Sequence, residues 1–171
     1  DAQSGARLAT LFVEDDPKYI EPQSPMIFLP TNDGRYLWLS RKDGYNHFYL
    51  GSTRKANSLQ QITRGEWEVT EFKGFSQDGK TIFFEATAAS PLETRLYSIG
   101  INGKNFVDLT PIEGVHHTSL NTSKTEFIDT YSSPTTPRIS RIVSTKGKEE
   151  KQLLKAEDPT KDAIMPEITL G

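Results

Sequence analysis

The sequence predicts an all-β fold, namely a partial β-propeller of about three four-stranded antiparallel blades plus part of a preceding blade. The main observation is a repeat: a turn followed by aromatic and β-branched residues occurs three times, with Trp38, Phe83 and Phe127 at corresponding positions, 45 and 44 residues apart. Four short strands fit into each period, and a period of about 40 to 50 residues with four strands is typical of a propeller blade. Helical solenoids fit poorly, because no stretch of the chain sustains apolar residues at helical spacing.

The expected strands follow the same order in each period. Each period opens with a short strand, at residues 25–29, 67–72 and 116–120. The second strand follows a turn and is rich in strand-forming residues, at 33–39, 78–84 and 122–128. The third strand is expected at 46–50, 94–99 and 137–142, and the fourth at 59–63, 106–110 and 150–154. Residues 8–13 would be the last strand of a preceding blade.

This order divides the chain into three parts. Residues 1–21 would be the end of the preceding blade and a connecting loop, residues 22–155 the three blades, and residues 156–171 an exit segment. The blades are expected at about 22–64, 65–111 and 112–155. A propeller closes about four to eight blades into a ring, so three blades cannot close one. Turn chemistry agrees with the hairpins, because the pairs Asp33-Gly34, Asp78-Gly79 and Asn102-Gly103 suit a left-handed backbone.

Composition excludes several classes of function. The 171 residues, 25% charged and 35% hydrophobic, describe a globular chain. With 20 Lys and Arg against 23 Asp and Glu, and basic residues scattered along the chain, the net charge of -3 gives no electrostatic reason to expect a nucleic-acid partner. No run approaches the ~20 apolar residues of a membrane span. The lack of cysteine excludes disulfides, thiolate metal sites and cysteine nucleophiles.

The segment Gly74-Phe75-Ser76-Gln77 is close to the Gly-x-Ser-x-Gly signature of a serine hydrolase, but Asp78 occupies its last position. That signature needs a sharp turn from a strand into a helix. Here the segment lies between two expected strands, which favours an ordinary turn. No catalytic residue is therefore expected in this chain.

The three histidines do not suggest a metal site. His116 and His117 are adjacent, so in a strand their side chains point to opposite faces and cannot chelate one ion. His47 is distant in the sequence, and no second cluster of ligands accompanies it. We expect no metal and no cofactor.

Two motifs carry a resemblance to a known family. Residues 40–49 read Ser-Arg-Lys-Asp-Gly-Tyr-Asn-His-Phe-Tyr and residues 62–69 read Ile-Thr-Arg-Gly-Glu-Trp-Glu-Val. They resemble the propeller of the dipeptidyl peptidase IV branch of the prolyl oligopeptidase family, which carries a Ser-x-x-Asp-Gly-Tyr-x-His hairpin followed by Ile-Thr-x-Gly-x-Trp-Glu-Val at similar spacing. The likeness covers most of the chain from about Pro22 onward, through residues 95–97 and 131–134 to Leu153 and Leu154.

The resemblance implies a non-catalytic part of a serine exopeptidase. In that family an eight-bladed propeller sits over an α/β-hydrolase domain that supplies the catalytic serine, aspartate and histidine. The chain would then be the last blades, with residues 156–171 leading toward the hydrolase. The implied partners are the other blades, the hydrolase domain and short peptides, and the implied location is the bacterial periplasm or the outside of the cell. The propeller would restrict cleavage to short peptides with an accessible N-terminus, often after proline.

The resemblance also bears on individual residues. The segment Tyr19-Ile20-Glu21-Pro22 falls where family members place a loop that faces the substrate cleft, so Ile20 and Glu21 are candidates for substrate binding, with a structural role equally open. Glu66 and Glu68 would share one face of a strand, as an acid–base pair would. Family members bind the substrate amine with paired glutamates on an earlier insertion that this chain lacks, so these two are expected to satisfy local donors while Trp67 packs between blades.

Two questions stay open at this point. A stand-alone propeller segment that binds proteins or peptides is the alternative function, because repeat architecture alone would allow it. Self-association is also expected, since the outward faces of the first and last blades would be uncovered. The apolar residues expected there are Phe28, Leu37 and Leu39 at one end and Phe127, Ile139 and Ile142 at the other. Alternatively, residues 1–21 and 156–171 fold over these faces and leave a monomer.

Overall fold

The computed structural model describes residues 3–15, 17–20, 25–146 and 149–158, and all regular elements among them are β-strands. The first sheet comprises β1 (Ile27–Phe28), β2 (Arg35–Ser40), β3 (His47–Ser52) and β4 (Lys55–Gln61). The second comprises β5 (Val69–Phe75), β6 (Thr81–Ala86), β7 (Arg95–Gly100) and β8 (Val107–Asp108). The third comprises β9 (Val115–Leu120), β10 (Glu126–Ser133), β11 (Thr136–Ser144) and β12 (Glu149–Lys155).

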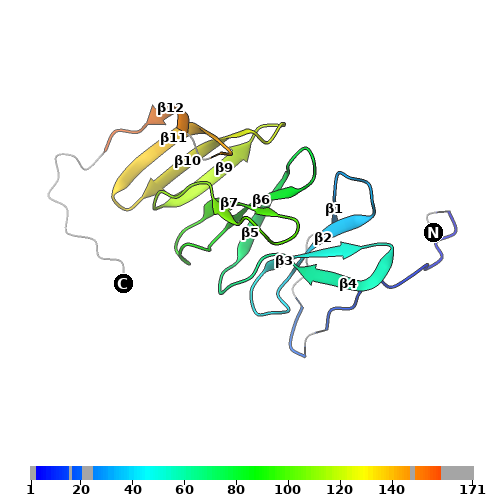
Figure 1. The fold of residues 1–171 in the computed structure, drawn as a ribbon. Coiled ribbons are helices and arrows are strands. Elements are labelled where there is room, and N and C mark those ends of the chain that lie inside the picture. The colour runs from blue at the N-terminus through cyan, green and yellow to red at the C-terminus, as the bar shows by residue number, and fades with distance from the viewer. Residues whose placement is uncertain (1–2, 16, 21–24, 147–148, 159–171) are drawn as a thin grey trace.

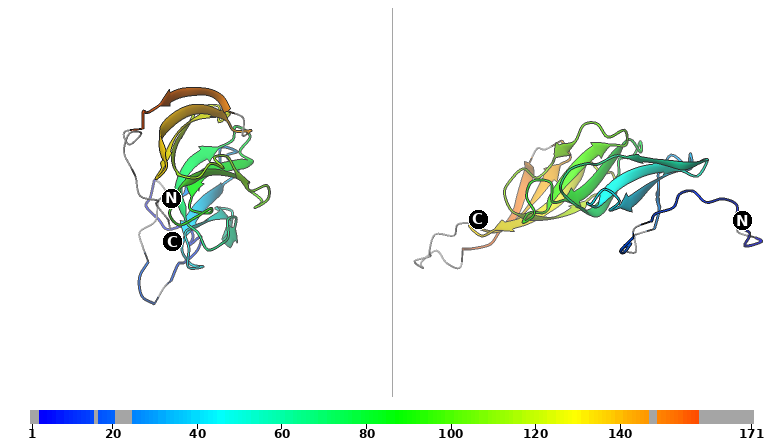
Figure 2. Two further views of the ribbon diagram at one scale, coloured as in Figure 1. Left: turned by 90° about the vertical axis from the view of Figure 1, so that its left-hand side faces the viewer. Right: turned by 90° about the horizontal axis from the view of Figure 1, so that it is seen from below.

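Each sheet is an antiparallel meander whose four strands pair in chain order. The sheets follow one another along the molecule and stack face against face (Figures 1 and 2). This arrangement of three four-stranded sheets confirms the predicted all-β blade architecture. Two strands are shorter than expected. β1, the first strand of the first sheet, and β8, the last strand of the second sheet, have only 2 residues each.

The tight turns form where the sequence predicts them. Asn102-Gly103 lies between β7 and β8, and Gly103 has a φ of 76°. Gly79 lies between β5 and β6 and has a φ of 66°. Both values lie in the left-handed region that glycine adopts without strain. In these three turns, one in the first sheet and two in the second, the side chain before the glycine closes the turn. It accepts a hydrogen bond from the backbone N of Arg35 at Asp33, of Lys80 at Asp78 and of Lys104 at Asn102.

The hydrophobic core lies between the sheets rather than within any one of them. Phe84 in β6 is fully buried against the first sheet, while its neighbour Phe83 packs with Phe127 against the third. Adjacent residues in a strand point to opposite faces, so β6 contributes to both interfaces. The cluster between the first and second sheets includes Leu37, Phe48, Ile82, Phe84 and Ile99, and the smaller cluster between the second and third includes Phe83, Leu96, Leu109, Phe127 and Val143.

Residues 8–13 do not form the predicted strand. Residues 6–15 are irregular. Among the described residues, a backbone hydrogen bond from the nitrogen of Asn57 to the oxygen of Leu11, at 2.7 Å, ties them to the first sheet. A strand needs a repeated ladder of such bonds with a neighbour. Instead this segment covers the outward face of the first sheet, where the ring of Phe12 lies 6.3 Å from that of Tyr36 and 5.1 Å from that of Trp38.

The predicted outward faces are wrong in part. Leu37 and Leu39 pack toward the second sheet, and the outward face carries Tyr36 and Trp38 instead. At the other end Phe127 is 1% exposed and faces the second sheet. Because side chains alternate along a strand, an error of one residue moves a whole strand to the other face. Of the expected set, Phe28 and Ile142 do lie on outward faces, whereas Ile139 pairs with Tyr131 and shares its inward face.

The outward face of the third sheet carries several apolar side chains that are exposed among the described residues. Ile128 pairs with Ile142, and Leu154 pairs with Ser140 next to them, so these side chains share one face. Ile128 is 46% exposed and Leu154 57% exposed. Val115, on the same face of β9, is also exposed.

We expect this face to drive self-association of the chain, because contiguous exposed apolar surface recruits a partner. Size exclusion with light scattering over a wide concentration range should show a mass that rises with concentration. Ile128→Lys should lower it, whereas Leu92→Lys, at an exposed leucine in a loop of the second sheet, should not. A monomer at every concentration that binds no hydrophobic dye would contradict the prediction.

Candidate functional site

The residues expected to contact substrate lie at the start of the described chain. Ile20 is in an irregular segment and is 41% exposed. Glu21 lies outside the described residues. The substrate role of this pair therefore stays a prediction.

Ser76 has the geometry of a turn residue. It lies between β5 and β6, where its hydroxyl donates to Asp78 at 2.7 Å and accepts from the backbone nitrogen of Thr81 at 2.9 Å. The bond from Ser76 is the largest of the contacts that hold the pKa of Asp78 below its ordinary value. A strand follows this turn rather than the helix that a nucleophile elbow requires.

The two family-like motifs meet in the structure. The hairpin between β2 and β3 reaches the entry to β5, where Asn46 and Val69 exchange a backbone hydrogen bond of 2.9 Å and a side-chain bond of 2.8 Å. The carboxylate of Glu68 pairs with Arg41 and accepts from the backbone nitrogen of Asn46 at 3.3 Å. These contacts tie the first sheet to the second.

Glu66 and Glu68 do not form an acid–base pair. Both precede β5, Glu66 in a bend and Glu68 in the irregular residue just before the strand, so the prediction that they share a strand face is wrong. Glu66 is exposed, whereas Glu68 makes the contacts above and donates its backbone N–H to the hydroxyl of Thr87 at 3.0 Å. The expected structural role is confirmed for Glu68.

His47 holds the linker from β4 to β5. Its Nδ1 lies 3.1 Å from the hydroxyl of Thr63 and its Nε2 lies 3.0 Å from the carbonyl oxygen of Gly65. The same hydroxyl accepts from the backbone nitrogen of Phe48 at 2.9 Å. The imidazole also meets the ring of Trp67 edge-on at 4.9 Å.

A hollow opens between the first and second sheets. Its volume is about 410 Å³, within the range of small-molecule pockets, which is about 300 to 1,000 Å³. Trp67 and Phe106 supply aromatic surface, with ring centres 5.7 Å apart, and Phe106 is 45% exposed. The remaining lining comes from Gln60, Gln61, Ile62, Thr63, Arg64, Ile99, Asn102 and Gly103. The hollow can take a small, partly apolar group.

Trp67 belongs to the core as well as to this hollow. Its ring stacks on Phe84 at 6.3 Å, and Phe106 stacks on Tyr97 at 5.0 Å. Burial is the main cause that raises the pKa of Tyr97 to about 12. The predicted packing of Trp67 between blades is confirmed, although the residue lies just before β5 rather than in it.

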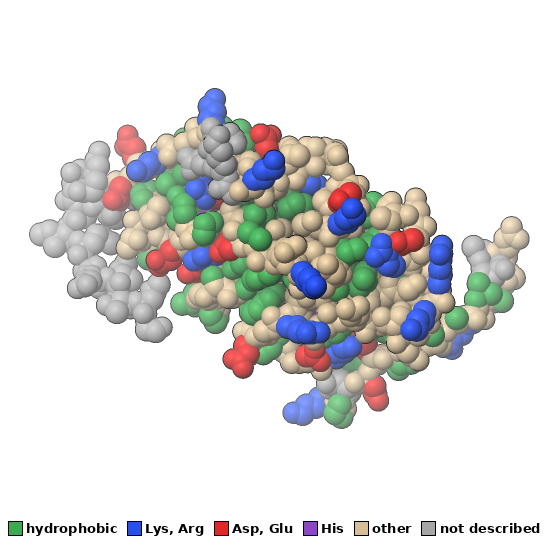
Figure 3. Space-filling view, viewed as in Figure 1, with side chains coloured by type: hydrophobic (Ala, Val, Ile, Leu, Met, Phe, Trp, Pro, Cys, Tyr) green, Lys and Arg blue, Asp and Glu red, His purple; other side chains and the backbone are tan. Residues whose placement is uncertain are grey.

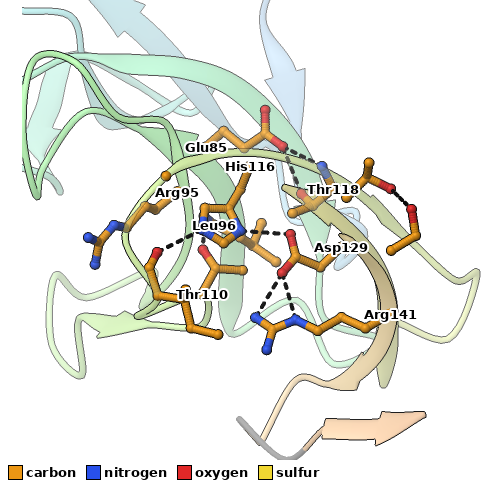
Figure 4. Close-up of polar contacts among 12 residues, drawn as sticks. Glu85, Arg95, Leu96, Thr110, His116, Thr118, Asp129 and Arg141 are labelled. Atoms are coloured by element: carbon orange, nitrogen blue, oxygen red, sulfur yellow. Dashed lines mark hydrogen bonds and ion pairs between the residues drawn. The ribbon is translucent and has the colours of Figure 1, made fainter. Parts of the chain in front are cut away.

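A network of charged groups is buried between the second and third sheets (Figure 4). Glu85 of β6 accepts from the nitrogen and the hydroxyl of Thr118 in β9, at 2.9 and 2.8 Å, and pairs with Lys73 at 3.2 Å. In the third sheet Asp129 lies between His116 and Arg141, with both of which it pairs.

Sequence reasoning missed Asp129 and Arg141. A signal was present, because Asp129 alternates with the apolar residues Phe127 and Tyr131 and therefore belongs to the inward face. A buried carboxylate needs a charged partner. Arg141 is the residue directly opposite in β11.

The described residues were also searched for metal sites and membrane-spanning helices. Within residues 3–15, 17–20, 25–146 and 149–158, no group of three or more His, Cys, Asp or Glu side chains could hold a metal ion. The described part of the chain contains no helix that could cross a membrane. Figure 3 shows Lys and Arg interspersed with Asp and Glu over one face of the molecule.

The chain was compared with known families and proteins. A model of the "Dipeptidyl peptidase IV (DPP IV) N-terminal region" matches residues 1–138. A "Probable dipeptidyl peptidase 4" of Emericella nidulans is 29% identical over 104 residues, which are 60% of this chain and 13% of the relative. A "Probable dipeptidyl-aminopeptidase B" of Aspergillus terreus is 27% identical over 142 residues, which are 77% of this chain and 15% of the relative.

Two solved structures are similar as well. Dipeptidyl peptidase 4 of Porphyromonas gingivalis matches with a TM-score of 0.65 and 30% identity, over 76% of this chain and 18% of that one. A candidate dipeptidyl aminopeptidase IV of Bacteroides ovatus matches with a TM-score of 0.73 and 31% identity, over 85% of this chain and 23% of that one. The chain therefore spans less than a quarter of the length of each of these relatives.

Replacing Trp67 tests whether the first junction depends on its ring. Trp67→Ala should lower the free energy of unfolding by up to about 3 to 5 kcal/mol, the range for removing a core aromatic side chain, because its partly buried ring packs on the core at Phe84. Urea unfolding followed by circular dichroism measures the change. Phe106→Ala is the control, since Phe106 is 45% exposed and should cost less. A loss below about 1 kcal/mol for Trp67→Ala would mean that its ring mainly lines the hollow.

Proposed function

The chain belongs to the dipeptidyl peptidase IV N-terminal region family, and we propose that it is a non-catalytic propeller segment of a serine-type dipeptidyl peptidase. In the whole enzyme this segment would narrow the access of short peptides to the active site. Its proposed partners are the remaining blades, an α/β-hydrolase domain and the peptides themselves. The observation that carries the proposal is the stack of three four-stranded sheets, because each sheet covers a face of the next, as blades do in a propeller.

The proposed blades follow the three sheets. The first would run over about residues 22–64, the second over 65–111 and the third over 112–155, and the strands at Ile27–Phe28 through Glu149–Lys155 fall inside these limits. Residues 1–21 would belong to the preceding blade and its connection, and residues 156–171 would lead toward the hydrolase domain.

A location outside the cytoplasm is part of the same proposal. The similar peptidases come from fungi and bacteria. We propose a bacterial enzyme that is periplasmic or secreted. The lack of cysteine is compatible with such a location, since the fold rests on sheet packing rather than on disulfides.

The proposal predicts that this chain alone does not cleave peptides. Chromogenic aminoacyl-proline substrates should show no turnover with the purified chain, because Ser76 lies in a turn and its hydroxyl is engaged by Asp78. The whole dipeptidyl peptidase 4 of Porphyromonas gingivalis serves as the positive control. Activity that stays proportional to the concentration of this chain after repurification would contradict the proposal.

The coding sequence downstream of residue 171 separates the two candidate functions. A Gly-x-Ser-x-Gly segment followed by Asp and His would identify the hydrolase domain. A coding sequence that ends without such a domain would favour the alternative, a stand-alone module for binding proteins or peptides. In that case the hollow at Trp67 and Phe106 is the place where such binding would be sought.

Substrate contact at Ile20 and Glu21 is tested in the whole enzyme. Ile20→Ala and Glu21→Gln should each lower kcat/KM for short peptides by about tenfold, the effect of losing one apolar or polar substrate contact of about 1.4 kcal/mol. Glu113→Gln, at an exposed site in the linker after β8, is the matched control. Unchanged kinetics in both variants would assign the segment a structural role.

A further inference from the structure

The ring of His116 lies at the junction between the second and third sheets, shielded from solvent. His116 is the second residue of β9, and its side chain is 0% exposed. Its backbone nitrogen donates to the carbonyl oxygen of Thr94, just before β7 of the second sheet, at 2.8 Å. Every hydrogen bond of this ring therefore has to come from the protein around it.

Both ring nitrogens of His116 face hydrogen-bond acceptors. Nδ1 lies 2.8 Å from Oδ1 of Asp129, and Nε2 lies 2.8 Å from the carbonyl oxygen of Ile112. A carbonyl oxygen can only accept. The other oxygen of Asp129 accepts from Nε and Nη2 of Arg141 at 3.0 and 2.9 Å, which is the pattern of an ionised carboxylate. Only the imidazolium carries a proton on each nitrogen, so only that form satisfies both contacts.

The other two histidines differ in this respect. The hydroxyl of Thr63 beside Nδ1 of His47 can donate, so a neutral ring with its proton on Nε2 satisfies both of its contacts. His117 is exposed, on the opposite face of β9. The chain thus contains two internal references for the state of His116.

Charged groups on the neighbouring elements are engaged elsewhere. Within the third sheet the ring of Tyr131 stacks on the ring of His116, with their centres 4.9 Å apart. The guanidinium of Arg141 lies 5.0 Å from the centre of the Tyr131 ring. In the second sheet the nearest ionisable groups hold one another or the backbone. Glu85 binds Thr118 and Lys73, Glu93 binds Arg95 and the nitrogen of Gly114, and Arg95 also binds Asp108. Asp129 is therefore the carboxylate that pairs with the His116 ring.

We propose that His116 is an acid-dependent latch that fastens the linker between β8 and β9 to the third sheet. In the protonated form the ring joins the carbonyl of Ile112 to Asp129 of β10. Loss of one proton removes one of these bonds and sets a nitrogen lone pair against an oxygen in a site without solvent, so the linker loosens. Because the linker connects the second sheet to the third, the stability of their junction would depend on pH.

The sign of the effect follows from proton linkage. The latch exists only while the ring carries a proton on each nitrogen. It is therefore complete at acid pH and is lost as the pH rises through the value at which the ring gives one proton up.

Nitrogen NMR of the histidine-labelled chain tests the proposal directly. At neutral pH His116 should show a proton on each ring nitrogen, as its two acceptors require, whereas His47 should show a single proton on Nε2. A His116 ring that carries one proton at neutral pH, or that titrates together with His117, would overturn the proposal. This measurement needs no variant, so it stands even where a variant fails to fold.

Urea unfolding at several pH values tests the consequence. Between about pH 6 and about pH 8 the equilibrium constant for unfolding should rise in the unaltered chain by about tenfold more than it does in His116→Gln. One linked proton changes this constant by at most about tenfold per pH unit. His47→Gln is the control and should keep the pH dependence of the unaltered chain. Equal pH dependence in His116→Gln and the unaltered chain would refute the latch.

Discussion

The structure depends on the second sheet being covered on both faces. Phe83 and Phe84 are neighbours in β6, are 5% and 0% exposed, and point in opposite directions. Burying one such side chain stabilises a fold by roughly 1.5 to 3 kcal/mol. A single sheet cannot bury both rings, so each sheet is stable only as a member of a stack. The same constraint explains why the irregular segment around Phe12 covers Tyr36 and Trp38 at the end of the stack.

Polar contacts decide how neighbouring sheets are joined. The hydroxyl of Thr63 accepts from the backbone nitrogen of Phe48, and the hydroxyl of Thr110 accepts from that of Leu96. Each threonine lies just after the last strand of its sheet. In the first and the second sheet the same kind of hydrogen bond therefore fixes the chain at the point where it leaves the sheet. The contacts of Asn46 with Val69 then fasten the first sheet to the second. The two motifs that resemble the dipeptidyl peptidase IV branch are thus in direct physical contact.

The two junctions between sheets differ in character. The first is mainly aromatic, with Trp67, Phe84 and Phe48 at its centre. The second combines a smaller apolar cluster with the buried charges of Glu85 and Asp129. Buried ion pairs add little net stability, yet removing one partner is costly because it leaves a charge unpaired. The second junction therefore depends on each of these buried charges keeping its partner.

The sequence by itself determined the blade architecture, the order of the strands, the three glycine turns and the family. These features depend on local patterns: the alternation of residues along a strand, the chemistry of Asn102-Gly103, and motifs of eight to ten residues. Tertiary structure alone decided which face each strand turns inward. A shift of one residue exchanges the two faces of a strand, and both Leu37 and Tyr36 are apolar enough to be buried. It also decided that residues 8–13 cover a face rather than extend a ladder, since a strand forms only where a partner offers its hydrogen bonds. The contacts of His116 with Ile112, Asp129 and, through it, Arg141 required the register of three strands and a linker at once, which no local pattern encodes.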